Sequence, residues 1–292
     1  MRARPSFRSL LATERPLIKP GAHDVISARL IEDAGFKAIA VGGLALLASQ
    51  RGLPDIGLAA LTDMVEAARH VVEATDLPCG VDGDDGYGDV KSVARTVMAY
   101  ERLGVGSIIF EDQDIRAKRP GEGKTTRVVP AEEMVRKLKV AVTTRDDRET
   151  LILARTDAHP IEGFDAAIRR ADAYLKAGAD GIFVSGLNDP AELRRIGARL
   201  KGAIQVATVT ERLLHLMPPP SELWEMGFGM VVYPQFVTTR TAAAAKGALS
   251  DLKRLSQGTI APAKITQLLD QSDGLQAIAR LPKWLKLETD CG

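Results

Sequence analysis

The sequence predicts an α/β fold, a (β/α)8 barrel of the TIM type with extra helices at its C-terminal end. Eight short apolar runs, each bounded by Gly, Pro or polar residues, indicate buried strands. Helical patterns alternate with these runs, and the order helix end, Gly, strand recurs along the chain. Strands that alternate with helices favour a parallel sheet, and eight such units favour closure into a barrel.

Each expected element has its own local signal. The expected strands are apolar runs at residues 16–21, 36–43, 77–81, 107–110, 150–154, 181–186, 203–207 and 230–234. The expected helices have apolar residues at helical spacing and lie at residues 6–12, 24–34, 62–74, 90–103, 131–143, 164–177 and 190–200. Asp24 is suited to cap the second helix and Gly35 to end it, whereas Pro190 suits a first helical position.

The chain beyond the last strand exceeds what a barrel needs. We therefore divide it into a barrel at residues 1–240 and a C-terminal helical extension at 241–292, with helices expected at 241–255 and 262–269. The extension caps the barrel or packs on a partner subunit, and Trp284 is a natural anchor for either arrangement.

Residues 112–130 show no periodic pattern and are rich in charge, Gly and Pro. A segment this long inside a compact domain is usually a lid or another functional loop. The alternative is a disordered insertion without a role. The position directly after an acidic strand end favours the lid.

Acidic residues stand at the ends of two neighbouring strands. Asp82 and Asp84 follow the strand at 77–81, and Glu111 follows the strand at 107–110. The two strand ends point the same way, so the carboxylates converge and repel one another unless a cation holds them. Mg²⁺ is the simplest such cation. The alternative is that the Asp/Gly-rich run after residue 81 is only a turn.

Other polar residues end strands on the same face, where barrel active sites lie: Arg155, Ser185 and Tyr233. Gly42 and Gly43 end the strand at 36–43 and allow a ligand to approach the backbone closely.

Composition limits the class of protein. A formal net charge of +1 without a basic run gives no case for nucleic acid. The sequence contains no run of about 18 apolar residues, so we expect no membrane span. The two cysteines, Cys79 and Cys291, imply no disulfide framework, and the N-terminus has no signal-peptide pattern. We expect a soluble cytoplasmic protein.

Five motifs in this order give the chain its resemblance to the isocitrate lyase and phosphoenolpyruvate mutase superfamily, close to methylisocitrate lyases and oxaloacetate decarboxylases. They are Gly21-Ala22-His23-Asp24, Leu53-Pro54-Asp55, Asp82-Gly83-Asp84-Asp85-Gly86-Tyr87-Gly88, Glu111-Asp112-Gln113 and Ala154-Arg155-Thr156-Asp157-Ala158. The resemblance implies a barrel whose C-terminal helix is swapped between subunits, with a homo-oligomer built as a dimer of dimers. It also implies Mg²⁺, with Mn²⁺ as a possible substitute, and a small carboxylic acid as substrate.

The resemblance also assigns roles to single residues. Asp82, Asp84, Glu111 and Asp55 match the metal-facing acids. Residues matched to substrate binding are Gly42, Gly43, Leu44, His23, Thr208 and Tyr233. Arg155 matches the arginine that grips a substrate carboxylate, and its alternative is a structural ion pair.

The lid departs from the lyase pattern. Lyase relatives carry a Cys and a His where this chain has Pro120 and Glu122. Proline has no acid–base group, so Lys118, Glu122 and Tyr87 remain as candidate catalytic groups beside Arg155.

The sequence therefore predicts a Mg²⁺-dependent carbon–carbon lyase that acts on a small 2-oxo or 2-hydroxy di- or tricarboxylate. Decarboxylation of an oxaloacetate-like acid needs least from the lid. The alternatives are a phosphonate-processing enzyme, either a phosphonomutase or a phosphonopyruvate hydrolase, and an inactive metal- or ligand-binding homologue.

Overall fold

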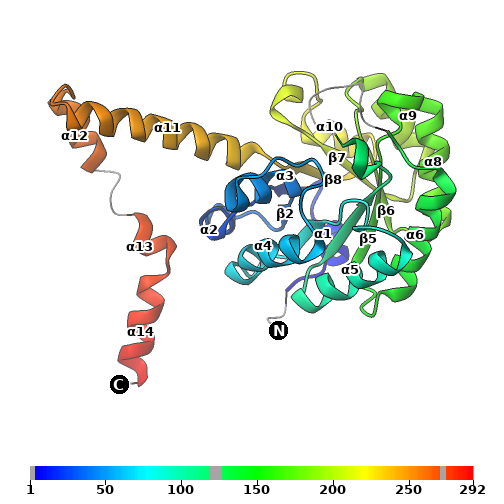
Figure 1. Ribbon diagram of the computed structural model, residues 1–292, viewed down its shortest axis with the longest axis horizontal. Coiled ribbons are helices and arrows are strands. Elements are labelled where there is room, and N and C mark those ends of the chain that lie inside the picture. Colours follow the sequence, from blue (N-terminus) through cyan, green and yellow to red (C-terminus); the bar gives the residue numbers. More distant parts are fainter. Residues whose placement is uncertain (1–3, 119–126, 270–273, 292) are drawn as a thin grey trace. The chain divides into compact units, whose positions relative to one another are not determined.

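Figure 1 shows a computed structural model of the chain, which describes residues 4–118, 127–269 and 274–291. The chain divides into two compact units, Met1–Phe236 and Val237–Gly292. The division falls a few residues before the boundary expected from the sequence, because one helix, α11 (Phe236–Ser256), begins directly after the last barrel strand.

The first unit is a (β/α)8 barrel, as predicted. Its eight parallel strands follow the order β1-β8-β7-β6-β5-β4-β3-β2. Their bounds are β1 Leu17–Pro20, β2 Ile39–Val41, β3 Cys79–Asp82, β4 Ser107–Glu111, β5 Leu151–Thr156, β6 Gly181–Val184, β7 Ile204–Thr208 and β8 Phe228–Tyr233. A bridge between Gly21 and Ala40 joins the ends of β1 and β2, so the sheet nearly closes. All eight expected strands are confirmed.

Helices surround this sheet (Figure 1). Their bounds are α1 Phe7–Thr13, α2 Val25–Asp33, α3 Gly43–Leu46, α4 Leu61–Ala74, α5 Val90–Leu103, α6 Ala131–Thr144, α7 His159–Glu162, α8 Phe164–Lys176, α9 Pro190–Arg199 and α10 Pro220–Glu225. The Asp24 side chain accepts a hydrogen bond from Ser27 N at 2.7 Å, which confirms the expected cap of α2. The sequence patterns miss α3, α7 and α10, because helices of four to six residues are too short to show a periodicity.

A cluster of buried apolar side chains fills the barrel at the N-terminal ends of the strands. Phe7 of α1 is fully buried there against Leu17, Leu151 and Met230. This helix therefore closes the lower end of the barrel, and the interior opens towards the carboxyl ends of the strands.

The second unit is helical. After α11 come α12 Pro262–Leu269, α13 Gly274–Ile278 and α14 Leu281–Cys291. Several large apolar side chains in this unit are exposed, among them Leu249, Leu252, Leu275 and Trp284. Exchange of these helices between subunits stays a prediction. None of the helices in the described ranges has the length and apolar character needed to span a bilayer.

Candidate active site

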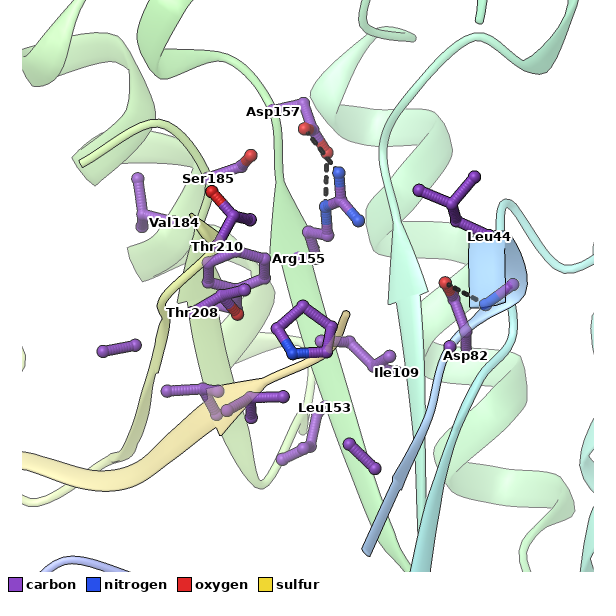
Figure 2. Close-up of a pocket in the computed structure, with 18 of the residues that line it drawn as sticks. Leu44, Asp82, Ile109, Leu153, Arg155, Asp157, Val184, Ser185, Thr208 and Thr210 are labelled. Atoms are coloured by element: carbon purple, nitrogen blue, oxygen red, sulfur yellow. Dashed lines mark hydrogen bonds and ion pairs between the residues drawn. The ribbon is translucent and has the colours of Figure 1, made fainter. Parts of the chain in front are cut away.

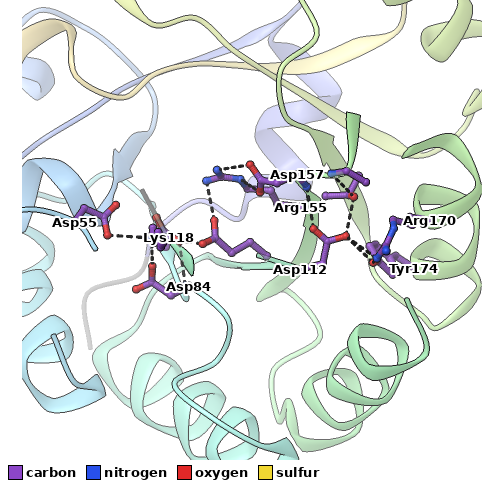
Figure 3. Close-up of polar contacts among 12 residues, drawn as sticks. Asp55, Asp84, Asp112, Lys118, Arg155, Asp157, Arg170 and Tyr174 are labelled. Atoms are coloured by element: carbon purple, nitrogen blue, oxygen red, sulfur yellow. Dashed lines mark hydrogen bonds and ion pairs between the residues drawn. The ribbon is translucent and has the colours of Figure 1, made fainter. Parts of the chain in front are cut away.

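The register of β3, β4 and β5 brings the predicted acidic and basic residues to one edge of the sheet. Asp82 pairs with Ile109, and Glu111 pairs with Arg155. Asp82, Glu111 and Arg155 lie at or next to the carboxyl ends of their strands. Figure 3 shows Arg155 beside Asp157, and Lys118 between Asp55 and Asp84.

The turn after β3 folds back over the end of β4. Asp84 has φ +46° and Gly86 has φ +87°, both in the left-handed region. Asp84 N donates to Asp82 Oδ1 at 3.1 Å, and Glu111 N donates to the Asp84 carbonyl at 2.8 Å. The run is thus a turn, and that turn also holds the Asp84 carboxylate beside Glu111. The two interpretations of the motif are compatible.

A lysine occupies the centre of the carboxylate cluster. Lys118 Nζ lies 2.6 Å from Asp84 Oδ1, 2.9 Å from Asp55 Oδ1 and 3.4 Å from Glu111 Oε1. The lysine is buried, with 5% of its surface exposed. The converging acids are therefore held by a cation, and in this structure that cation is an ammonium group from the segment that follows β4 (Figure 3).

Burial and mutual repulsion make the strand-end carboxylates hard to ionise. Burial, followed by the neighbouring Asp84, raises the pKa of Asp82 to about 6. Burial raises the pKa of Glu111 to about 8, although Arg155 and Lys118 oppose the shift. Burial by itself lowers the pKa of Lys118, but the surrounding carboxylates outweigh it and raise that pKa. A cation that lies among these carboxylates therefore stabilises their ionised forms.

Arg155 is fixed by a fork of ion pairs. Its Nε and Nη2 donate to the two carboxylate oxygens of Asp157, both at 2.8 Å, and Nη1 lies 2.9 Å from Glu111 Oε2. The guanidinium also stands 5.4 Å above the Phe183 ring centroid. Its side chain keeps 25% exposure. Arg155 is therefore held by structural ion pairs and also lines the pocket, and its role in gripping a substrate carboxylate stays a prediction.

Asp112 anchors the ends of β4 and β5 from behind. Its carboxylate accepts from Thr156 Oγ1 at 2.7 Å, from Asp157 N at 2.9 Å and from Tyr174 Oη at 2.7 Å, and pairs with Arg170 at 3.3 Å. Burial raises the pKa of Asp112, although these donors oppose the shift. Because Asp157 in turn holds Arg155, this network sets where the guanidinium points (Figure 3).

The acids fit a hard divalent cation by their chemistry. Asp55, Asp82, Asp84 and Glu111 offer only carboxylate oxygens, which Mg²⁺ prefers. Both Glu111 oxygens are buried and accept no hydrogen bond, since their contacts with Lys118 and Arg155 meet the distance for an ion pair but not hydrogen-bond geometry. Within the described ranges, no three His, Cys, Asp or Glu side chains form a ready cage. The Lys118 ammonium lies among these carboxylates, in the place that a metal ion would take.

A cavity of about 460 Å³ opens beside this cluster. The residues that line this cavity include five of those predicted to bind substrate: Gly42, Gly43, Leu44, Arg155 and Thr208 (Figure 2). Asp55, Asp82 and Lys118 also line it. Gly43 N points at Asp82 Oδ2 across 3.5 Å, at the limit of a hydrogen bond. The backbone at the end of β2 thus faces Asp82, and its binding of a substrate carboxylate stays a prediction.

The structure places other predicted residues outside this cavity. His23 is 4% exposed, and its carbonyl accepts from Ser49 Oγ at 3.0 Å and Gln50 Nε2 at 2.9 Å. The Tyr87 hydroxyl lies 3.5 Å from the Tyr100 hydroxyl. These two predicted residues do not line the cavity.

Two further predictions concern the edge of the site. Tyr233 packs edge-on against Phe236 and does not line the cavity, whereas the next residue, Pro234, does. Glu122 lies outside the described residues.

Sequence reasoning assigned no role to three residues that the cavity brings to Arg155 and Thr208: Asp157, Ser185 and Thr210 (Figure 2). Asp157 follows Arg155 within the same motif, and Ser185 ends a predicted strand, so the sequence pattern of each could have indicated a place at the site. Thr210 lies beyond β7, and no sequence pattern pointed to it.

The comparisons with known proteins agree with this geometry. The family model for phosphoenolpyruvate phosphomutase matches residues 7–253. A 2-methylisocitrate lyase of Bacillus subtilis is 40% identical over 238 residues, which cover 82% of this chain and 77% of the relative. A 2,3-dimethylmalate lyase of Eubacterium barkeri is 38% identical over 234 residues, 80% of each chain.

A crystal structure of 2,3-dimethylmalate lyase superposes with a TM-score of 0.84 at 28% identity and covers 98% of this chain and 94% of that one. The family match spans most of the sequence, and Asp82, Arg155 and the glycine-rich end of β2 line one pocket. The chain belongs to the phosphoenolpyruvate mutase and isocitrate lyase superfamily.

Proposed function

We propose that this protein is a Mg²⁺-dependent carbon–carbon lyase that acts on a small 2-hydroxy or 2-oxo carboxylic acid. One observation carries the proposal: a cluster of buried carboxylates around a single cation adjoins a preoriented Arg155 in one cavity. The printed activities of the relatives, 2-methylisocitrate lyase and 2,3-dimethylmalate lyase, support the same class of reaction.

Asp82, Asp84 and Glu111, together with Asp55, would hold the ion. When bound, it supplies Lewis-acid stabilisation for the negative charge that develops as the carbon–carbon bond breaks. The chain supplies binding and orientation: Arg155 presents guanidinium N–H groups to a substrate carboxylate, and the backbone of Gly42 and Gly43 lies opposite.

Lys118 serves this site as a counterion rather than as an acid. While its ammonium stays among the carboxylates its pKa is raised, so it releases its proton poorly. Withdrawal of Lys118 frees the carboxylate oxygens for the metal ion.

The cavity wall indicates the substituents of the substrate. The wall formed after β5, β6 and β7 is mainly apolar and includes Pro160, Ile161, Val184, Leu187, Leu193, Leu213 and Met217. Among the described lining residues, positive charge comes from Lys118, Arg155 and Lys19 at the floor, and none from that wall. We therefore favour an acid that turns an alkyl group, rather than a further carboxylate, towards the wall.

Decarboxylation of an oxaloacetate-like acid is the second candidate. It is favoured by Pro120, which stands where lyase relatives carry a proton-donating Cys. Loss of carbon dioxide needs no base to remove a hydroxyl proton, and solvent can reprotonate the product. The phosphonate alternative is favoured by the description of the family model, phosphoenolpyruvate phosphomutase, and not by a residue of the site.

The test is turnover with Mg²⁺ on 2,3-dimethylmalate, 2-methylisocitrate, isocitrate, oxaloacetate and phosphonopyruvate, with detection of pyruvate, glyoxylate and phosphate. We expect cleavage of an alkyl-substituted hydroxy acid or of oxaloacetate, abolished in Asp84→Ala. Asp165→Ala, a control whose side chain is 79% exposed, keeps the activity. Phosphate release alone, or unchanged turnover in Asp84→Ala, contradicts the proposal.

We also propose that the C-terminal helices pack on a second copy of the chain in a homo-oligomer. The exposed Leu249, Leu252, Leu275 and Trp284 support this, since such apolar side chains gain free energy when covered. Light scattering after size exclusion should give a multiple of 31.4 kDa for the intact chain. A monomer at micromolar concentration contradicts it.

A further inference from the structure

The floor of the main cavity holds a lysine that the proposed reaction does not use. Lys19 lies on β1 with its side chain inside the barrel and 4% of its surface exposed. Its ammonium stands 4.5 Å from the ring centroid of Phe7, which closes the lower end. Among the residues that the structure describes, none forms a hydrogen bond or an ion pair with this ammonium. The barrel thus encloses a cation without a counter-charge.

Space for this ammonium is provided by a glycine. A Cβ added to Gly80 of β3 would stand 2.5 Å from Lys19 Nζ and would also collide with Ser107 Oγ. The Lys19 ammonium and the Ser107 hydroxyl therefore both lie over the bare backbone of Gly80, in surroundings that are otherwise mostly apolar.

This floor belongs to the same cavity as the strand-end site. Lys19, Gly80 and Ser107 line it together with Asp82 and Arg155. Gly80 precedes Asp82 by two residues on β3, so the floor lies about 7 Å below the acidic cluster. Apolar side chains line the space between, among them Ala40, Ile109, Leu153, Val206 and Val232.

An enclosed ammonium without a partner costs free energy, because it has lost its hydration. Burial lowers the pKa of Lys19 to about 8. Cys79, the titratable group that opposes this shift, has its own pKa raised to about 12 by burial and stays a neutral thiol. At neutral pH Lys19 therefore keeps most of its charge, and an anion is the group that would best offset the cost.

We propose that Lys19 and Ser107 form a second anion subsite at the barrel floor, which binds the distal carboxylate of a diacid whose first carboxylate lies at the strand-end site. This rests on the proposed function, because it takes an organic acid to occupy the upper end. The apolar walls between the two ends suit a methylene chain, and the separation suits a chain of adipate length.

The probes are adipate and hexanoate, which differ only in the distal carboxylate and carry no 2-oxo or 2-hydroxy group. Their affinities are measured by calorimetry with Mg²⁺ present, on wild type, Lys19→Met and Lys91→Met. Lys91 is the control, since its side chain is 87% exposed. We expect adipate to bind roughly tenfold or more tightly than hexanoate to wild type and Lys91→Met, as a charge-assisted hydrogen bond would provide. In Lys19→Met the two acids should bind equally.

An adipate preference that survives Lys19→Met, or no preference in wild type, overturns the subsite. If Lys19→Met does not fold, Ser107→Ala takes its place, with the preference expected to fall and an unchanged preference counting against the proposal. The turnover panel separates the two proposals: a lyase without an adipate preference refutes the subsite alone, whereas an adipate preference without turnover on any acid refutes the proposed reaction and leaves the subsite standing.

Discussion

Replacement of Lys118 by Met tests whether the lysine and a metal ion compete for the same carboxylates. Met keeps most of the side-chain volume and removes the charge. In wild type a divalent ion must first displace an ammonium that lies within 3.4 Å of Asp84, Asp55 and Glu111. In Lys118→Met nothing has to be displaced, so Mg²⁺ should bind more tightly even though a ligand-facing residue has been removed.

The magnitude follows from the contacts. At an effective dielectric constant of about 20, charges about 3 Å apart attract by roughly 5–6 kcal/mol for each pair. Most of this is offset by the desolvation of the buried partners, so the loss of one partner of such a cluster costs about 3–5 kcal/mol. If that free energy is what the metal overcomes, the apparent Kd for Mg²⁺ should fall by a factor on the order of 10²–10⁴.

The assay is calorimetric titration of Mg²⁺ into both proteins, with thermal unfolding in chelator and in excess Mg²⁺. Lys118→Met should unfold at a lower temperature than wild type in chelator and regain stability with Mg²⁺. Lys137→Met is the matched control, because Lys137 is equally buried but its ion pairs are with Asp85 and Glu133 and not with the four predicted metal ligands. It should lose stability without any change in the Kd for Mg²⁺.

An unchanged or weaker Mg²⁺ affinity in Lys118→Met would refute the competition. So would an equal gain in Lys137→Met, because the effect would then come from general loosening of the barrel. Tighter metal binding with lost turnover would instead show that Lys118 also has a later role in the reaction.

Three further predictions concern the residues around the cavity. Arg155→Lys keeps the charge but loses the fork held by Asp157, so KM for the cleaved acid should rise about 10–100-fold with a smaller change in kcat; an unchanged KM would leave Arg155 a structural role only. Asp112→Ala leaves Arg170 and Tyr174 without their buried partner and should destabilise the barrel by about 3–5 kcal/mol by thermal unfolding, whereas loss of activity at full stability would contradict the anchoring role. The pKa of Lys19 lies at about 8 in the folded chain, below its ordinary value of 10.5, so the charged lysine lowers the folding stability of wild type by roughly 3 kcal/mol. This loss is full below pH 8 and disappears as the pH rises towards 10.5, so Lys19→Met should be more stable than wild type at pH 7, by an amount that shrinks at pH 10. A stability difference between the two proteins that does not change with pH would refute the buried charge as its cause.

The barrel could be predicted from the sequence because its signals are local. A strand such as β5 is a short apolar run next to a turn, and its helical neighbours repeat apolar residues three and four positions apart. The carboxyl ends of parallel strands share one edge, so the sequence alone predicts that Asp82, Glu111 and Arg155 lie together.

The roles of single side chains at that edge depended on contacts between distant parts of the chain. Lys118 follows a strand end in the sequence, but only the folded loop brings its ammonium to Asp55 and Asp84. His23 and Tyr87 stand in recognisable motifs, yet the cavity does not reach them. Motif position fixes a residue to an element, whereas the direction of its side chain is decided by packing.

Lys19 shows the same division most clearly. In the sequence it is one charged residue inside the short run Pro16-Leu17-Ile18-Lys19-Pro20, and nothing local tells which face of the strand is enclosed. The tertiary structure decides this, because the closed sheet turns Leu17 and Lys19 inwards and the bare backbone of Gly80 leaves room for the ammonium. The sequence alone therefore determined the barrel and its acidic edge. The cation among the acids and the cation at the floor were decided by tertiary packing, since a buried charge is defined by what surrounds it.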